Sequence, residues 1–151
     1  MLATNNYSFY YCSALERIKL PELTIMNEGT PFQNLSALKE LRLPKNTSSL
    51  SGNKVFTCNA LELLDLGVAS EIGTSLSGSN YTKLTTLILR NTDAVVTPYA
   101  STIFNTSSPI AKGEGKILVP RSMVASYRAD SAWGAYSAVI YAIEDYPELA
   151  E

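Results

Sequence analysis

The sequence predicts a solenoid in which each repeat contributes one short parallel β-strand, and two observations lead to this expectation. The pattern Leu-x-x-Leu-x-Leu occurs four times at a constant step of 23 residues, and its twelve aliphatic positions are Leu15, Ile18, Leu20, Leu38, Leu41, Leu43, Leu61, Leu64, Leu66, Leu84, Leu87 and Leu89. Proline, glycine and asparagine recur between these positions. Such breaks argue against one long Leu-rich helix, which would need a 3.6-residue period.

A 23-residue unit with this pattern falls within the range of leucine-rich repeats. One unit cannot bury its own apolar face, so neighbouring units stack around a continuous core. The expected fold class is therefore a leucine-rich-repeat solenoid, β-rich, with a parallel β-strand in each 23-residue α/β repeat and a C-terminal helical cap. We expect a single domain over 1–151, with repeats at about 9–31, 32–54, 55–77 and 78–100, a lengthened fifth turn at 101–120 and a cap at 121–151.

The x-Leu-x-Leu part of each unit predicts the strands. They are expected at Arg17–Leu20, Glu40–Leu43, Leu63–Leu66, Thr86–Leu89 and Lys116–Pro120. Before the fifth strand the spacing lengthens from 23 to 30 residues. The extra residues fall in the Ser/Pro/Gly stretch Asn105–Gly115, which predicts a surface loop.

Alternation along these strands predicts an outward face that is a candidate for partner binding. Its residues are Arg17, Lys19, Glu40, Arg42, Leu63, Asp65, Thr86, Ile88 and Leu118. Opposite charges adjoin laterally in Arg17/Glu40 and Arg42/Asp65, which also suits a solvated face that keeps the strands in register. Leu63, Ile88 and Leu118 form either an exposed contact patch or a surface covered by the loop 105–115 or by the C-terminal strand 141–143.

The two cysteines occupy equivalent positions, because Cys12 and Cys58 are two repeats apart and Leu35 and Tyr81 continue the same column. Two strand spacings separate their Cα atoms by about 10 Å, which exceeds the reach of a disulfide. We expect both thiols to be buried and free. We expect no bound metal.

The C-terminal segment predicts the cap of the solenoid. Pro120 ends the last strand, Ser122 is the expected N-cap of a helix that reaches Asp130, and apolar residues continue to Ile140. Trp133 is expected to pack in the core, with a sugar-stacking platform as the alternative. The acidic tail 144–151 is expected to be solvated.

The N-terminal end has no predicted cap, since only eight residues precede Phe9. An uncapped solenoid exposes an apolar edge and unpaired strand groups. We therefore expect either that the chain is the C-terminal part of a longer array, or that two copies associate through this end. The opening residues 1–6 have no basic and apolar regions typical of a signal peptide.

Composition excludes several functions. The chain has no histidine and a formal net charge of −2, so histidine-dependent catalysis and a basic field for nucleic acid are both absent. No apolar run is long enough to predict a membrane span. We expect no enzymatic activity, no cofactor, no nucleic-acid partner and no membrane insertion.

The segments Phe9–Pro21 and Phe32–Pro44 share the pattern Phe-x-x-(Cys/Leu)-Ser-x-Leu-x-x-(Ile/Leu)-x-Leu-Pro, which resembles the BspA-type leucine-rich repeats of bacterial surface proteins. The segment 115–144 is similar to the closing unit of such proteins in gut bacteria and their phages. This resemblance implies an extracellular or cell-surface location and adhesion through a protein or glycan partner. The alternative is a phage virion module of the tail or fibre, which neighbouring genes would reveal. The resemblance brings no catalytic residues.

Overall fold

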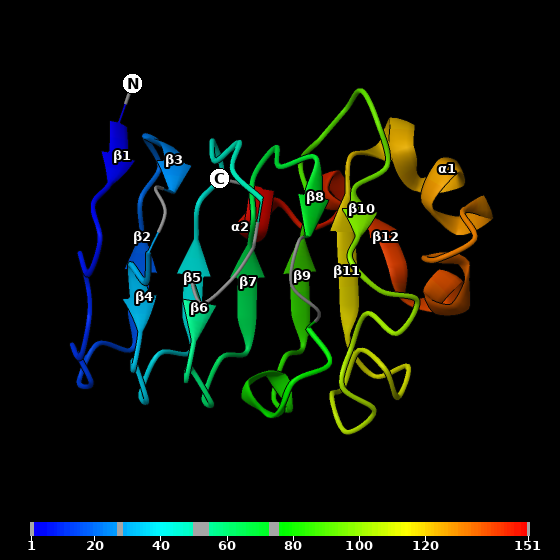
Figure 1. Ribbon diagram of the computed structural model, residues 1–151. Coiled ribbons are helices and arrows are strands. Elements are labelled where there is room, and N and C mark those ends of the chain that lie inside the picture. Colours follow the sequence, from blue (N-terminus) through cyan, green and yellow to red (C-terminus); the bar gives the residue numbers. More distant parts are fainter. Residues whose placement is uncertain (1, 27–28, 50–54, 73–75, 151) are drawn as a thin grey trace.

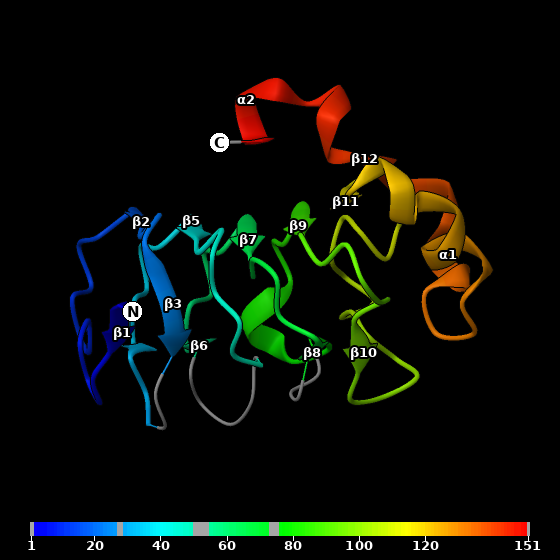
Figure 2. The same ribbon diagram turned by 90° about the horizontal axis from the view of Figure 1, so that it is seen from above.

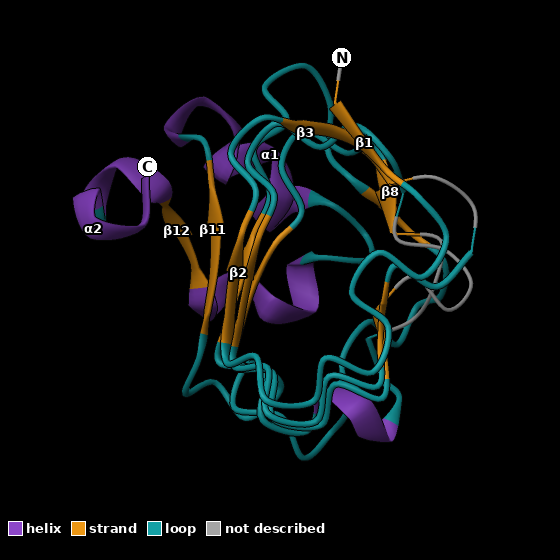
Figure 3. Cartoon of the chain, turned by 90° about the vertical axis from the view of Figure 1, so that its left-hand side faces the viewer, coloured by secondary structure: helices purple, strands orange, loops and turns teal. Residues whose placement is uncertain are grey.

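The computed structural model describes residues 2–26, 29–49, 55–72 and 76–150, and it shows a solenoid of stacked turns (Figure 1). Segments 27–28, 50–54 and 73–75 of the first three predicted repeats lie outside the described residues. Viewed along the solenoid axis, the successive turns superpose (Figure 3). This superposition follows from the constant repeat length, which puts the same residue type at the same place in every turn.

Six parallel strands form one side of the solenoid. Their order is β2 (Arg17–Lys19), β5 (Glu40–Arg42), β7 (Leu63–Asp65), β9 (Thr86–Ile88), β11 (Lys116–Val119) and β12 (Ile140–Ala142). Arg17, Glu40, Leu63, Thr86 and Lys116 are successive register partners across the first five strands. The predicted strands and their register are therefore confirmed, with each strand one residue shorter than expected.

Short strands pair on other sides of each turn. β1 (Leu2–Thr4) pairs with β3 (Leu23–Met26), β4 (Phe32–Gln33) with β6 (Val55–Phe56), and β8 (Glu71–Ile72) with β10 (Thr97–Pro98). A 3₁₀ turn, η1 (Ser79–Tyr81), replaces the bend of the earlier repeats. The first residues of the chain thus join the solenoid through β1.

The aliphatic columns form the core. Leu38, Leu61 and Leu84 have no exposed surface, and Leu41, Leu64 and Leu87 are equally buried. The backbone repeats as faithfully as the side chains, since Tyr11, Asn34 and Thr57 have positive φ angles of 60°, 59° and 56° at equivalent positions. The first three turns therefore bend at a left-handed residue at this position, a conformation that Asn adopts readily and Tyr rarely.

The cysteine column is only partly as predicted. Cys58 is buried and its thiol lies 3.3 Å from the Phe32 carbonyl, whereas Cys12 is exposed. Both are free. The expectation that both are buried is wrong for Cys12, because no turn stacks on its outer side within the described residues.

The C-terminal cap is built from η2 (Arg121–Met123), α1 (Val124–Ala129) and η3 (Gly134–Val139). Trp133 is fully buried, and its indole N–H donates a hydrogen bond to the Val96 carbonyl at 2.7 Å. The core interpretation of Trp133 is therefore confirmed. Tyr127 is also buried, and its hydroxyl oxygen accepts from the Val96 amide at 3.0 Å.

Two local predictions at this end need correction. Ser122 is not the N-cap, because helical turns begin one residue earlier and the Arg121 amide donates instead to the Glu144 carboxylate at 3.0 and 3.1 Å. The segment 105–115 has no helix or strand beyond turns, as predicted, but it is not purely a surface loop. Its Ile110 is 1% exposed and joins the core.

Candidate interaction face

The outward side of the six-stranded sheet carries the candidate residues. Strand alternation directs Ile18, Leu41 and Leu64 into the core and leaves their neighbours on the other side of the sheet. All nine predicted residues therefore lie in register on one face, which we call the outer face: Arg17, Lys19, Glu40, Arg42, Leu63, Asp65, Thr86, Ile88 and Leu118.

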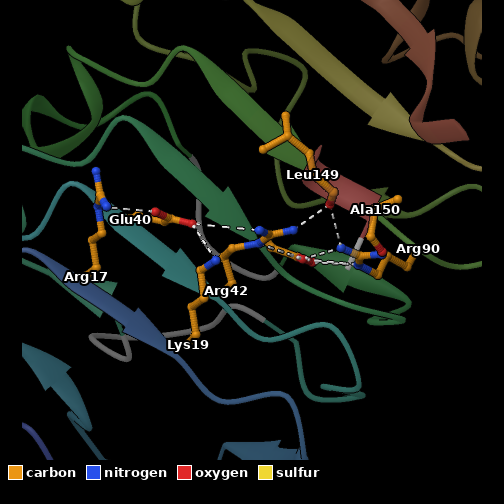
Figure 4. A network of polar contacts seen from close by, with 8 residues as sticks. Arg17, Lys19, Glu40, Arg42, Arg90, Leu149 and Ala150 are labelled. Carbon is orange, nitrogen blue, oxygen red and sulfur yellow. Dashed lines mark hydrogen bonds and ion pairs between the residues drawn. The ribbon is translucent and has the colours of Figure 1, made fainter. Parts of the chain in front are cut away.

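A polar network crosses this face (Figure 4). The Glu40 carboxylate lies 3.6 Å from Arg17, 3.8 Å from Lys19 and 3.8 Å from Arg42. Arg42 lies in turn 4.0 Å from Asp65. The predicted lateral pairs Arg17/Glu40 and Arg42/Asp65 are confirmed.

The interior end of the network is a buried ion pair. Asp65 has no exposed surface, and its carboxylate accepts from Arg90 at 2.8, 3.0 and 3.2 Å. It also accepts from the Gly67 amide at 3.0 Å. Gly67 has a φ angle of +66°, and a Cβ there would lie 2.4 Å from the Leu43 carbonyl oxygen. The tight turn after β7 thus needs glycine, and it helps to fix the carboxylate.

The carboxylates of the network are paired with cations. Glu40 and Asp65 each lie within 4.0 Å of an arginine. Four cations, Arg17, Lys19, Arg42 and Arg90, share these two carboxylates, so the network carries excess positive charge. This arrangement suits binding of electronegative groups.

The C-terminal segment lies over one half of the outer face (Figure 2). This segment, residues 143–150, comprises η4 (Ile143–Asp145) and α2 (Pro147–Ala150), and we call it the strap. Ile143 packs with Ile88 and Leu118 in a separate apolar cluster, to which Leu63, Tyr146 and Leu149 contribute partly buried side chains. Ile88 and Leu118 consequently have no exposed surface.

Polar contacts fasten the strap to the face at both of its ends. Near its start, Glu144 accepts from the Arg121 amide and Asp145 pairs with the Arg121 guanidinium. Near its end, Arg42 donates to the Leu149 carbonyl at 2.5 Å, and Arg90 donates to the Leu149 and Ala150 carbonyls at 3.1 and 2.8 Å.

Two expectations are therefore corrected. Leu63, Ile88 and Leu118 do not form an exposed contact patch, because the strap buries Ile88 and Leu118 and leaves Leu63 half-buried at the side of the same cluster. The tail from Glu144 onward is not simply solvated, since Tyr146 and Leu149 pack on the face. Of the two alternatives for covering the patch, the C-terminal segment 141–143 is borne out, since Tyr141 and Ile143 belong to this cluster together with Tyr146 and Leu149, whereas the loop 105–115 does not contribute to it.

The strap divides the outer face into two halves. In the covered half, Arg42 is 3%, Asp65 0% and Thr86 8% exposed. In the open half, Arg17 and Lys19 are exposed and Glu40 is half-buried. The binding role predicted for the nine residues stays a prediction, and only the open half is accessible for it.

The N-terminal turn next to the open half exposes most of the large apolar side chains that are exposed in the described residues. These are Leu2, Tyr7, Tyr10, Tyr11 and Leu15, accompanied elsewhere only by Val68 and Tyr99. The three tyrosine rings contact one another edge to face, with centroids 5.1 Å apart for Tyr7 and Tyr10 and 4.5 Å for Tyr10 and Tyr11. Strand β2 forms the edge of the sheet within the described part of the chain.

The fold and the repeated strand register define a leucine-rich-repeat solenoid. The family model described as BspA type leucine rich repeat region matches residues 3–111 in six copies, so the chain belongs to this family. Proteins of this family are protein-interaction or surface modules and are typically surface-associated. No curated protein matches the chain closely enough to count as a relative. Within the described ranges, no helix is long and apolar enough to cross a membrane.

Sequence reasoning missed the strap and Arg90. The sequence contains one feature that points to Arg90 and one that points to the strap. Arg90 stands where the earlier repeats have Pro21, Pro44 and Gly67, which marks a change of role at the end of the strand. Ile143, Tyr146 and Leu149 are spaced three residues apart in an otherwise acidic tail, a weak amphipathic pattern.

Proposed function

We propose that the chain is a non-enzymatic interaction module that binds a protein or glycan partner at a bacterial surface and thereby mediates adhesion. Membership of the BspA-type family supports an interaction or surface role. The solenoid provides a stiff frame, because the aliphatic columns are packed without exposed surface from Leu38 to Leu87. A preorganised frame binds with a smaller loss of conformational entropy.

The observation that carries this proposal is the concentration of exposed aromatic side chains at one end of the solenoid. Tyr7 is 61% and Tyr11 65% exposed, and Tyr10 lies between their rings. Tyrosine is enriched at binding surfaces, because its ring supplies apolar area and its hydroxyl a hydrogen bond. The rings also suit stacking on a sugar, so protein and glycan partners both fit.

The charges on the edge strand β2 bear on the chemistry of the partner. Arg17 and Lys19 project from the edge strand β2 and share the single carboxylate of Glu40. A partner with acidic or other electronegative groups is therefore favoured at this edge.

Self-association through the same end is the less favoured arrangement. A two-fold axis would pair β2 with a second β2 in antiparallel fashion, and Arg17 and Lys19 of one copy would then lie beside those of the other. Like charges on facing strands are destabilising. Association of two copies through this end stays a prediction, and a monomer at high protein concentration would exclude it.

The test is binding of the full chain to bacterial cells and to a glycan array, with two matched tyrosine variants. Tyr11→Asn introduces the residue that the next turn has at the equivalent position, Asn34, so the backbone bend is kept. Tyr99→Ser removes a tyrosine that is even more exposed, at 76%, from another turn of the solenoid. We expect Tyr11→Asn to weaken binding about tenfold or more, as for an interface hot spot, and Tyr99→Ser to have no effect. Equal effects of the two variants would contradict the proposal.

A further inference from the structure

The covered half of the outer face holds the strap by contacts that another peptide could make equally well. We propose that this half is a peptide-binding site for an acidic, amphipathic segment of a partner protein, and that the strap occupies the site until the partner displaces it. This inference rests on the proposed binding role of the module. It assigns the partner class and the regulation to a part of the face that is closed in the free chain.

The polar contacts of the site recognise peptide backbone. Arg42 donates a hydrogen bond to the Leu149 carbonyl oxygen, and Arg90 donates to the carbonyl oxygens of Leu149 and Ala150, all of which belong to the main chain of the strap (Figure 4). Main-chain carbonyls are present in every peptide, so these contacts do not depend on the sequence of the occupant. The two guanidiniums are held in place by the buried carboxylate of Asp65.

The apolar contacts of the site determine which peptide sequences can bind. Ile88 and Leu118 form the floor of the site and are fully buried under the strap. The strap meets them with Ile143, Tyr146 and Leu149, which lie three residues apart along one side of the η4–α2 segment. A ligand with large apolar residues at this spacing would cover the same floor.

Charge favours an acidic ligand. Arg42 and Arg90 are joined on this half by Lys116, whose ammonium lies 4.8 Å from the centre of the Tyr146 ring. The strap itself carries Glu144, Asp145 and Glu148. The occupant seen in the structure thus has the charge that complements the site.

The strap is held loosely enough to be displaced. Only Ile143 of its three apolar residues is nearly buried, at 7% exposure, whereas Tyr146 and Leu149 are half-buried. Its final helix, α2, has only four residues. If the open form is populated at about 0.1–10%, the strap weakens the apparent affinity for a partner by about 10- to 1,000-fold.

The test uses the full chain and a synthetic peptide with the sequence Ile-Glu-Asp-Tyr-Pro-Glu-Leu-Ala-Glu, which is that of residues 143–151. Binding is measured by NMR titration, with the amide signals of β5, β7 and β9 as the readout. The variant Leu149→Ser loosens the strap, and Leu149→Ala serves as a milder second variant. We expect the loosened variants to bind the peptide at least about tenfold more tightly than the unmodified chain does.

Controls separate the site from unspecific attraction. Adding Arg90→Gln to Leu149→Ala should abolish peptide binding, whereas adding Lys83→Gln, a cation away from the outer face, should not. A peptide with serine in place of its tyrosine and leucine should not bind. The proposal is overturned if natively folded loosened variants do not bind, or if Arg90→Gln leaves binding intact.

Two further results, dimer formation by the loosened variants and loss of binding in Tyr11→Asn, are interpreted as follows. Concentration-dependent dimers of the loosened variants would make a second copy the occupant and would overturn the assignment to a partner protein. Loss of cell and glycan binding in the Tyr11→Asn variant does not bear on this site, because Tyr11 lies outside it. Failure of the proposed function and failure of this inference are therefore distinguishable.

Discussion

The two ends of the solenoid differ in how far the apolar residues of their turns are buried. At the C-terminal end, α1 and η3 close the core, with Trp133 and Tyr127 fully buried and in edge-to-face contact. At the N-terminal end, Leu15 is 37% exposed, whereas Leu38, its equivalent in the next turn, has no exposed surface. The neighbouring turn, and not the residue type, decides burial in a solenoid.

The outer face shows the same contrast within one sheet. Just before the strands of the open half, the lateral pair Lys39–Glu16 is solvated, with side chains 47% and 59% exposed. On the covered half, the Asp65–Arg90 pair is 0% and 16% exposed because the strap lies over it. Ion pairs between neighbouring strands are therefore exposed on the open half, and they are buried and bind the strap where the strap covers them.

The largest expected effect comes from truncating equivalent leucines in adjacent turns. Leu38→Ala should lower the free energy of unfolding by about 2–5 kcal/mol, because it leaves a cavity in a closed core. Leu15→Ala should cost less than about 1 kcal/mol, because solvent already reaches that side chain. Urea denaturation of both variants measures the difference.

Comparison of Leu15→Ala with Leu38→Ala also tests whether another copy covers the N-terminal turn. If another copy stacked there in solution, Leu15→Ala would cost as much as Leu38→Ala, and its cost would rise with protein concentration. Equal costs would contradict an open end.

Alkaline pH should weaken the closed end. Burial raises the pKa of Tyr127 to about 12, against an ordinary value of 10.0, while its hydrogen bond with the Val96 amide acts in the opposite direction. Since the folded pKa is the higher one, the stabilisation is complete below pH 10 and is lost as the pH rises toward 12. Burial raises the pKa of Tyr81 as well, so it adds to the effect with the same sign.

The loss should approach about 1.4 kcal/mol per pH unit for Tyr127 alone. Denaturation of the unmodified chain and of Tyr127→Phe between pH 9 and pH 11.5 measures it. The variant should be less stable at neutral pH, because Val96 loses its acceptor, yet it should fall less steeply. Parallel slopes would show that Tyr127 ionises equally in the folded and unfolded chains.

The smallest expected effect is on the exposed ion pair that precedes the strands of the open half. Lys39→Ala removes the 3.1 Å pair with Glu16, and exposed pairs contribute about 0–1 kcal/mol. Its effect on unfolding should decrease further in 0.5 M salt, where screening is strong. A cost above that range would mean that a further segment covers the open half.

The period of the sequence was enough to predict the strands and their register. Arg17, Glu40, Leu63, Thr86 and Lys116 align in the structure as the 23-residue step requires. A repeated unit reports the same local environment several times, so chance matches are suppressed. The core role of Trp133 followed from the same need to close the stack.

The strap could not be placed from the sequence, because it has no repeat to follow. Its position depends on Arg42 and Arg90, which lie 107 and 59 residues before Leu149. Contacts between residues so far apart cannot be recognised from the tail alone, whose sequence shows only a short amphipathic pattern. The burial of Cys12 was predicted wrongly for a related reason. The repeat predicts that its side chain points toward the core, but only a preceding turn would bury it.

The reactivity of the two cysteines tests most directly the claim that the first turn is exposed in this chain and that the turns further along are buried. Cys12 and Cys58 occupy equivalent positions two turns apart, and only Cys12 is exposed. With a thiol reagent such as DTNB under native conditions, one thiol per chain should react rapidly and the second only upon unfolding. Cys12→Ser should remove the rapid phase, and Cys58→Ser should leave it unchanged. Protection of Cys12 as strong as that of Cys58 would contradict the account.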